Sequence, residues 1–219
     1  MNKIITISNA VSMVKDGMTI MIGGFLGCGN PHKIIEALCE TDVKDLNLIC
    51  NDGGLPDYGV AKLIAKKKIK SLMASHVGMN PDVANQQHSG ELALTLVPQG
   101  SLAEMIRAGG AGLGGVLTPT GIGTIVADGK QVIQIDGKDF LLEKPLRADV
   151  ALICGYKVDK KGNVWYKGVT RNFNVCMATA ADIVIVEADN IVECGEITPE
   201  DVVTPGIYVD YIVNGGEIK

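Results

Sequence analysis

Short apolar runs alternate with helical patterns through most of the chain. The apolar runs, each of strand length, lie at residues 19–22, 46–50, 71–75, 92–97, 150–155 and 183–186. Helical patterns occupy residues 31–40, 59–66, 82–89 and 101–108. Continuous apolar runs are typical of parallel strands that are buried on both faces. The alternation predicts an α/β fold, with an open and largely parallel sheet flanked by helices.

The segment 109–142 departs from this alternation. It is rich in glycine, and two short β-like pieces at residues 131–135 and 140–142 are joined through Asp136-Gly137, a favoured hairpin turn. We expect a glycine-rich β excursion from the main sheet. No fixed-period repeat, low-complexity segment or long linker divides the chain, so residues 1–219 are expected to form a single domain.

The apolar run at residues 19–22 leads directly into a glycine-dense turn. Glycine tolerates positive φ and has no Cβ, so this turn can bring N–H groups close to a ligand or to another part of the chain. Asn30 is expected as the N-cap of the next helix and Pro31 as its first residue, and that helix start would favour an anion. The spacing is neither G-x-G-x-x-G nor a phosphate-binding loop, which disfavours nucleotide cofactors. An ordinary strand-to-helix turn is the alternative. The glycines concerned are Gly23, Gly24, Gly27 and Gly29.

The segment from Asp16 to Pro31 resembles the signature of family 1 coenzyme A transferases at every position. That pattern is Asp-Gly, two residues, three apolar residues, Gly-Gly-Phe, three residues, Gly, one residue and Pro. The resemblance continues at residues 49–54, 74–81, 97–104, 106–115, 118–121, 171–174 and 204–206. It covers nearly the whole chain, which is similar to α subunits of the short-chain fatty-acid type.

The resemblance implies a fold related to sugar-phosphate isomerases, with α and β subunits built alike. It implies ping-pong transfer of CoA among acids such as acetate, butyrate and acetoacetate through a glutamyl-CoA thioester. The family's nucleophile is a Glu in a Ser-Glu-Asn-Gly type motif on the β subunit, and this chain has no Glu followed by Asn-Gly. We therefore expect a homologous β subunit as partner, in an α2β2 or larger assembly. Coenzyme A is then a substrate, and no permanently bound cofactor is implied.

Two polar residues at predicted strand ends are candidates to support this chemistry. Asn51 and Gln99 fall at carboxyl ends of strands, where open parallel sheets bind their ligands. Their amides could stabilise developing oxyanions or bind substrate carboxylates. A purely structural role in turns is the alternative for both. In the family the glycine turn is the proposed CoA-binding segment, which here comprises Gly24, Phe25, Leu26, Gly27, Cys28, Gly29 and Asn30.

Further polar residues are weaker candidates. Helix-start N–H groups could activate Cys28, and His76 could polarise a carbonyl, but packing and a structural hydrogen bond are the simpler interpretations. Glu104 and Glu143 lie near family-like stretches, yet each is more simply a surface or supporting carboxylate than a nucleophile.

Composition narrows the classes of function. The net charge of −5 gives no basic surface for nucleic acid. The six cysteines include no C-x-x-C pair, so neither a zinc site nor another metal site is predicted. No leader-like segment or apolar run of membrane-spanning length is present, so we expect a cytoplasmic enzyme component and no membrane partner.

Two alternatives stay open. One is a non-catalytic module that binds acyl-CoA or a sugar phosphate through the glycine turn. The other is a 3-oxoacid or dicarboxylate CoA-transferase subunit, which would need a cationic side chain in its acid pocket. Arg107 and Arg171 are the residues that would decide this second alternative.

Overall fold

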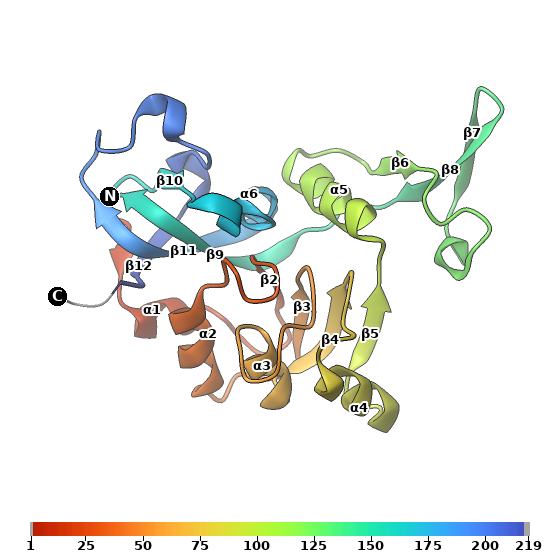
Figure 1. Cartoon of the computed structure of the whole chain (residues 1–219), viewed down its shortest axis with the longest axis horizontal. Helices are drawn as coiled ribbons and strands as arrows, with labels where there is room; N and C mark the ends of the chain where they lie inside the picture. Colours follow the sequence, from red (N-terminus) through yellow and green to blue (C-terminus); the bar gives the residue numbers. More distant parts are fainter. Residues whose placement is uncertain (1, 217–219) are drawn as a thin grey trace.

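The computed structural model describes residues 2–216 and centres on one large twisted sheet (Figure 1). Every neighbouring pair along its main path is parallel, and β10 (Val164–Trp165) alone adds to β9 in the antiparallel sense. This confirms the predicted open and largely parallel α/β sheet. The main path runs β1 (Ile4–Ile5), β12 (Tyr211–Asn214), β11 (Ala181–Val192), β9 (Ala148–Asp159), β2 (Thr19–Ile22), β3 (Leu46–Ile49), β4 (Ile69–Ala74) and β5 (Ala93–Leu96).

Both faces of the sheet are buried because successive strand residues point to opposite sides. In β2, Ile20 and Ile22 join one apolar cluster, whereas Met21 joins the other. The first cluster is covered by α1 (Ile7–Val11), α2 (His32–Cys39), α3 (Ala61–Ala65) and α4 (Pro81–Ser89). The second is covered by α5 (Gln99–Gly110) and α6 (Asn174–Met177), which lie across the sheet from the other four helices (Figure 1). The short 3-10 helices are η1 (Ile125–Ala127), η2 (Gly168–Arg171), η3 (Pro199–Asp201) and η4 (Gly206–Tyr208).

The predicted strands and helices are all present, with differences at their ends. The run at residues 19–22 coincides with β2, and the helical pattern at residues 101–108 lies inside the longer α5. The largest difference is in β9 and β11, which have 12 residues each. Their second halves carry polar residues such as Lys157 and Asn190, so the apolar run ends before the strand does.

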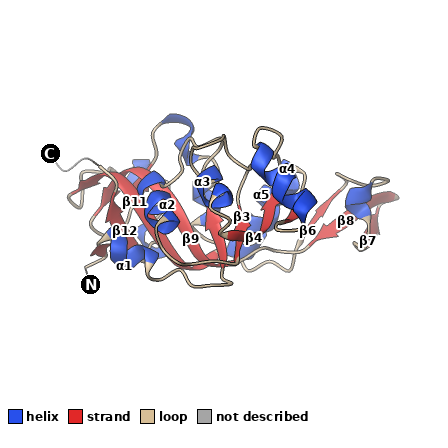
Figure 2. Cartoon of the chain, turned by 90° about the horizontal axis from the view of Figure 1, so that it is seen from below, coloured by secondary structure: helices blue, strands red, loops and turns tan. Residues whose placement is uncertain are grey.

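The segment from β6 to β8, which follows α5, leaves the main body as the predicted excursion. β6 (Val116–Thr118), β8 (Lys138–Glu143) and β7 (Val132–Ile135) form a separate antiparallel sheet in that order. Asp136 and Gly137 have φ values of 49° and 74°, as a type I′ hairpin turn requires. Figures 1 and 2 show this small sheet projecting past the β5 end of the main sheet. The hairpin is thus as predicted, while β6 was not predicted.

No helix within residues 2–216 is long and apolar enough to cross a membrane.

Candidate functional site

The loops that follow β2, β3, β4 and β5 surround a cavity of about 310 Å³ at the carboxyl edge of the sheet. This is where an open parallel sheet binds its ligands. The cavity brings together Asn51 and Gln99, which are 48 residues apart in sequence, with Phe25 and Leu26 of the glycine turn. Its full lining is Phe25, Leu26, Asn51, Asp52, Ser75, His76, Met79 and Gln99.

A chain of hydrogen bonds connects three of these side chains. Gln99 Nε2 donates to Asn51 Oδ1 at 2.6 Å, and Asn51 Nδ2 donates to Asp52 Oδ2 at 2.8 Å. The Asp52 carboxylate also accepts from the N–H groups of Leu26 at 2.9 Å and Gly54 at 2.8 Å. Asp52 therefore fixes the loop after β2 against the loop after β3, and fixes the orientation of the Asn51 amide.

The two predicted amides differ in accessibility. Asn51 is only 2% exposed, and its side-chain oxygen also accepts from Ser75 Oγ at 3.3 Å. Gln99 is exposed, with its bond to Asn51 as the only hydrogen bond of its side chain within residues 2–216. Gln99 thus retains one N–H and its carbonyl oxygen for a ligand, whereas the Asn51 amide is engaged by protein groups.

The glycines of the turn after β2 are required by contacts within the chain. A Cβ on Gly24 would lie 2.0 Å from Asn30 Nδ2, and one on Gly27 would lie 2.1 Å from the Tyr58 ring. Both glycines also have positive φ, 126° and 84°. The sequence allowed the glycines to serve close approach either to a ligand or to another part of the chain. The contacts of Gly24 and Gly27 show that close approach to another part of the chain accounts for them. The side chains that the turn exposes are Phe25 and Cys28.

Phe25 and Cys28 close a two-residue hairpin turn by exchanging backbone hydrogen bonds of 3.0 and 2.9 Å. Leu26, inside this turn, has φ of 46°, which is uncommon for a residue with a Cβ. The bond from its N–H to Asp52 helps to stabilise that conformation. The turn therefore presents Phe25 and Leu26 to the cavity in a fixed geometry.

The prediction for the start of α2 was wrong. Pro31 occupies the N-cap position, and no side chain caps the helix there. Asn30 instead bridges two loops, donating to the Gly23 carbonyl at 2.6 Å and accepting from the Val60 N–H at 3.2 Å. Its amide is therefore engaged by loop backbone groups and does not cap the helix.

The anion at the start of α2 belongs to the protein itself. The N–H groups of Lys33 and Ile34 donate to the carboxylate of Glu187, at 3.1 and 2.8 Å. Glu187 lies on β11, and burial raises its pKa while these two hydrogen bonds oppose the rise. The start of α2, which the sequence predicted to favour an anion, thus binds the Glu187 carboxylate of the same chain.

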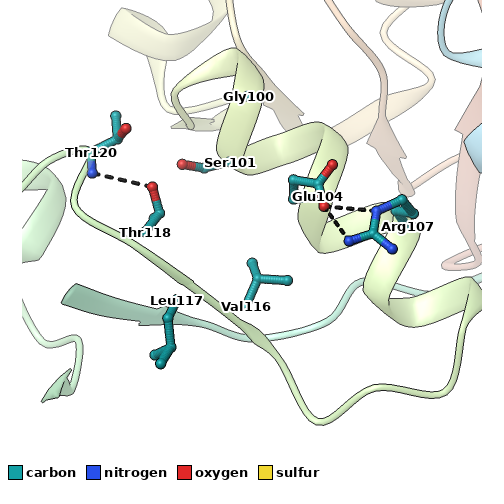
Figure 3. A pocket seen from close by; sticks show the side chains of 8 residues that line it. All are labelled: Gly100, Ser101, Glu104, Arg107, Val116, Leu117, Thr118 and Thr120. Atoms are coloured by element: carbon teal, nitrogen blue, oxygen red, sulfur yellow. Dashed lines mark hydrogen bonds and ion pairs between the residues drawn. The ribbon is translucent and has the colours of Figure 1, made fainter. Parts of the chain in front are cut away.

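Several other candidates lie away from the cavity. Glu143 is 2% exposed and pairs with Lys130 at 2.6 Å in the projecting sheet. Glu104 and Arg107 pair with each other on α5 and line a separate cavity (Figure 3). Arg171 is the last residue of η2 and is also absent from the lining of the first cavity. The described lining therefore contains neither of the cations that a dicarboxylate pocket was expected to use.

Sequence reasoning missed part of the lining and left His76 as a weak candidate. His76 and Ser75 follow β4, just as Asn51 follows β3, so the same strand-end argument identifies them. Nearby Cys50 is buried and donates through Sγ to the Asp52 carbonyl at 3.0 Å, and burial raises the pKa of its thiol. Cys50 is therefore held as a structural thiol. Within residues 2–216 no three His, Cys, Asp or Glu side chains are grouped to hold a metal ion.

Among the curated relatives of this chain, two bacterial proteins match over nearly their full length. An acetate CoA-transferase subunit alpha of Escherichia coli K12 is 50% identical over 99% of this chain and 99% of its own. An acetoacetyl-CoA:acetate/butyrate CoA transferase alpha subunit of Clostridium acetobutylicum is 53% identical over 97% of each. These similarities leave the alternative of a non-catalytic binding module without support.

Among solved structures, an acyl-CoA transferase from Escherichia coli O157:H7 (YdiF), in a thioester complex with CoA, superposes with a TM-score of 0.88. It is 23% identical, and the match covers 97% of this chain and 47% of that one, so it supports the fold. The model of the Coenzyme A transferase family matches residues 4–215. Over nearly its whole length, this chain therefore belongs to the coenzyme A transferase family, as an alpha subunit.

Proposed function

We propose that this chain forms one half of the active site of a short-chain acyl-CoA:carboxylate CoA-transferase, and that a homologous β subunit supplies the nucleophilic Glu. The observation that carries the proposal is the exposed Gln99 amide, fixed by Asn51 and Asp52 at the carboxyl edge of the sheet. A preorganised N–H donor in such a place is what a developing oxyanion requires.

The reaction begins with attack of a glutamate carboxylate on the acyl thioester. A C–O bond forms, the carbonyl oxygen becomes an oxyanion, and collapse expels CoA as a thiolate and leaves an acyl-glutamyl anhydride. The thiolate then attacks the glutamyl carbonyl of the anhydride, which forms the glutamyl-CoA thioester and releases the first acid as its carboxylate. The second acid reverses these steps. Gln99 would donate its remaining N–H to the oxyanion, and Asn51 would orient Gln99.

Among the described residues, the one carboxylate that lines the cavity is engaged by protein groups. Asp52, which lines it, is 4% exposed and accepts three hydrogen bonds. None of the glutamates in residues 2–216 lines the cavity. This supports a nucleophile in the other subunit, and hence an assembly of α and β chains such as α2β2.

The lining also favours short monocarboxylates over dicarboxylates. It contains no Lys or Arg among the described residues, and Phe25, Leu26 and Met79 give it apolar surface. An acyl group such as acetyl, butyryl or acetoacetyl would meet this surface without leaving a second carboxylate unpaired. The names of the two bacterial relatives favour the same acids.

We further propose that the segment from Gly24 to Asn30 contacts coenzyme A. Within residues 2–216 the N–H groups of Gly24, Gly27 and Gly29 have no acceptor, and Phe25 borders the cavity. The thioester end of an acyl-CoA in the cavity would lie against this turn.

The test is a transfer assay with butyryl-CoA or acetoacetyl-CoA and acetate, on this chain alone and on the chain co-expressed with its β partner. We expect activity in the mixture and none with the single chain. Activity of the single chain would place the nucleophile among its own glutamates and overturn the division of roles.

An assay with succinate as the acceptor distinguishes a monocarboxylate enzyme from the 3-oxoacid or dicarboxylate class. A monocarboxylate enzyme transfers CoA to acetate and butyrate at least tenfold more efficiently than to succinate, because the second carboxylate has no partner in the lining. Equal use of succinate would favour the 3-oxoacid or dicarboxylate class instead.

A further inference from the structure

The imidazole of His76 lines the first cavity, and the proposed reaction does not use it. The rings of the other two histidines donate to backbone carbonyls, His32 to Gly27 at 2.9 Å and His88 to Ala84 at 2.8 Å. The His76 ring, by contrast, makes no hydrogen bond or ion pair within residues 2–216, and the residue is exposed. Its ring nitrogens are therefore available to a ligand in the cavity.

The surrounding backbone nevertheless fixes the position of His76. Its carbonyl accepts from the Gly53 N–H at 2.9 Å, and the N–H of the preceding Ser75 donates to the Asn51 carbonyl at 2.9 Å. These bonds join the loop after β4 to the loop after β3. On the other side, a Cβ on Gly78 would lie only 3.3 Å from Cε1 of the ring. The ring is thus packed against the Gly78 backbone, and its donor is preorganised at one place in the lining.

The other polar side chains of the lining are already committed. The Asn51 amide bonds to Asp52 and Gln99, and the Asp52 carboxylate accepts three hydrogen bonds. The Ser75 hydroxyl has one hydrogen, which it donates to the Asn51 carbonyl at 2.7 Å. In the proposed reaction the remaining N–H of Gln99 serves the oxyanion. Among the described side chains of the lining, His76 therefore carries the hydrogen-bond donor that is left for the acyl group itself.

The acyl groups of the proposed reaction differ in their need for such a donor. Acetoacetyl and butyryl have the same number of carbons, but acetoacetyl carries a carbonyl oxygen at C3 where butyryl carries a methylene. Against the apolar side chains of Phe25, Leu26 and Met79, that oxygen is costly to bury unless it accepts a hydrogen bond. A neutral oxygen needs one N–H and no opposite charge, and an imidazole carries an N–H in either protonation state.

We propose that the His76 ring donates a hydrogen bond to the C3 carbonyl oxygen of the acetoacetyl group, and thereby determines how well acetoacetyl-CoA is used relative to butyryl-CoA. The inference rests on the proposed transferase function and adds a specificity-determining residue to it. Because the second half of the transfer reverses the first, the same contact serves free acetoacetate as the acceptor acid. Acetyl and butyryl groups have no oxygen at C3 and do not use it.

The experiment compares kcat/KM for acetoacetyl-CoA and for butyryl-CoA, each with acetate as acceptor, on the co-expressed α and β chains. His76→Phe keeps a ring of similar size and removes the donor. It should lower kcat/KM for acetoacetyl-CoA about tenfold, because the C3 oxygen is left unpaired. The value for butyryl-CoA should stay within twofold. His88→Phe, at an exposed histidine of α4, is the matched control and should change neither value.

His76→Gln tests whether the N–H is the property that matters. Its amide supplies a donor without a ring, so kcat/KM for acetoacetyl-CoA should return to within about threefold of the unmodified enzyme. A loss of the same size for both substrates in His76→Phe would overturn the inference, because a contact with C3 cannot affect butyryl transfer. An unchanged ratio of the two values would overturn it as well.

A binding measurement separates failure of the inference from failure of the proposed function. The assembled protein should broaden the NMR methyl signals of acetoacetate and of butyrate. His76→Phe should weaken the broadening of acetoacetate and leave that of butyrate unchanged. If the unmodified assembly transfers no CoA but this difference persists, the proposed function fails and the His76 contact stands. Equal broadening of acetoacetate by both proteins would overturn the contact.

Discussion

Two helices of this chain, α2 and α5, have first turns that are completed in different ways. At α2 the N–H groups of Lys33 and Ile34 bind the chain's own Glu187 carboxylate. At α5 the corresponding N–H groups have no acceptor within residues 2–216, and the nearby Ser101 hydroxyl is unpaired. Both helix starts favour an anion for the same electrostatic reason, but only the second faces an open cavity. The comparison teaches that a helix start indicates a ligand site only when the protein has not already filled it.

The largest effect should come from Gln99 on the first turn of α5. Gln99→Ala removes an exposed oxyanion donor, so kcat should fall on the order of 100-fold. The unfolding temperature should change little, because the side chain makes one hydrogen bond at the surface. Steady-state kinetics and thermal unfolding of the co-expressed enzyme provide both values. Gln87→Ala, at an exposed glutamine of α4, serves as the control. A loss in kcat of less than threefold would remove Gln99 from the site.

The opposite pattern is expected at α2. Glu187→Ala leaves two N–H groups at a buried helix start without their acceptor, so the free energy of unfolding should fall by about 2–3 kcal/mol. Urea unfolding of the variant measures this, with Glu36→Ala at an exposed ion pair as the control. A loss below 1 kcal/mol would mean that water replaces the carboxylate, and that the two helix starts are less different than the structure indicates.

Asn51 should have a smaller catalytic effect than Gln99, since it acts by orienting that residue. Asn51→Ala should lower kcat on the order of tenfold. The double variant with Gln99→Ala should be no slower than Gln99→Ala alone, because the two side chains act through one hydrogen bond. Additive losses in the double variant would show instead that Asn51 contributes separately.

The smallest effect concerns pH. Burial raises the pKa of Glu187 in the folded state above its ordinary value of 4.5, so the folded protein binds more protons there than the unfolded protein. The pH-dependent part of its contribution to stability is therefore fully present below pH 4.5 and is lost as the pH rises through the raised pKa. Glu187→Gln should flatten this part of the stability curve. Unfolding measured at several pH values for both proteins gives the difference, and parallel curves would contradict the assignment.

Local signals in the sequence were sufficient for much of the fold. The apolar run of β2 and the Asp136-Gly137 turn are determined by neighbouring residues, so both were predicted correctly. The placement of Asn51 and Gln99 at strand ends also followed from local pattern. Whether they act in catalysis stays a prediction.

The errors arose where distant residues decide the structure. Asn30 directly precedes Pro31, as expected of an N-cap, but its amide hydrogen-bonds to loop backbone groups. The start of α2 is completed instead by Glu187 on β11. Glu187 is 153 positions from Ile34, so no local pattern connects them. That the His76 ring has no hydrogen bond within residues 2–216 is likewise visible only in the folded chain.

The pairing of β1 with β12 has a consequence for how the chain is made. β1 is formed by Ile4 and Ile5, and its partners are Ile212 and Val213 near the other end of the chain. The strands β2 to β5 pair in sequence order, so they can assemble while synthesis continues. The first strand, by contrast, has no partner until residues 211–214 have left the ribosome. One edge of the sheet therefore forms last, and a polypeptide that ends before residue 211 leaves its own N-terminal strand without a partner.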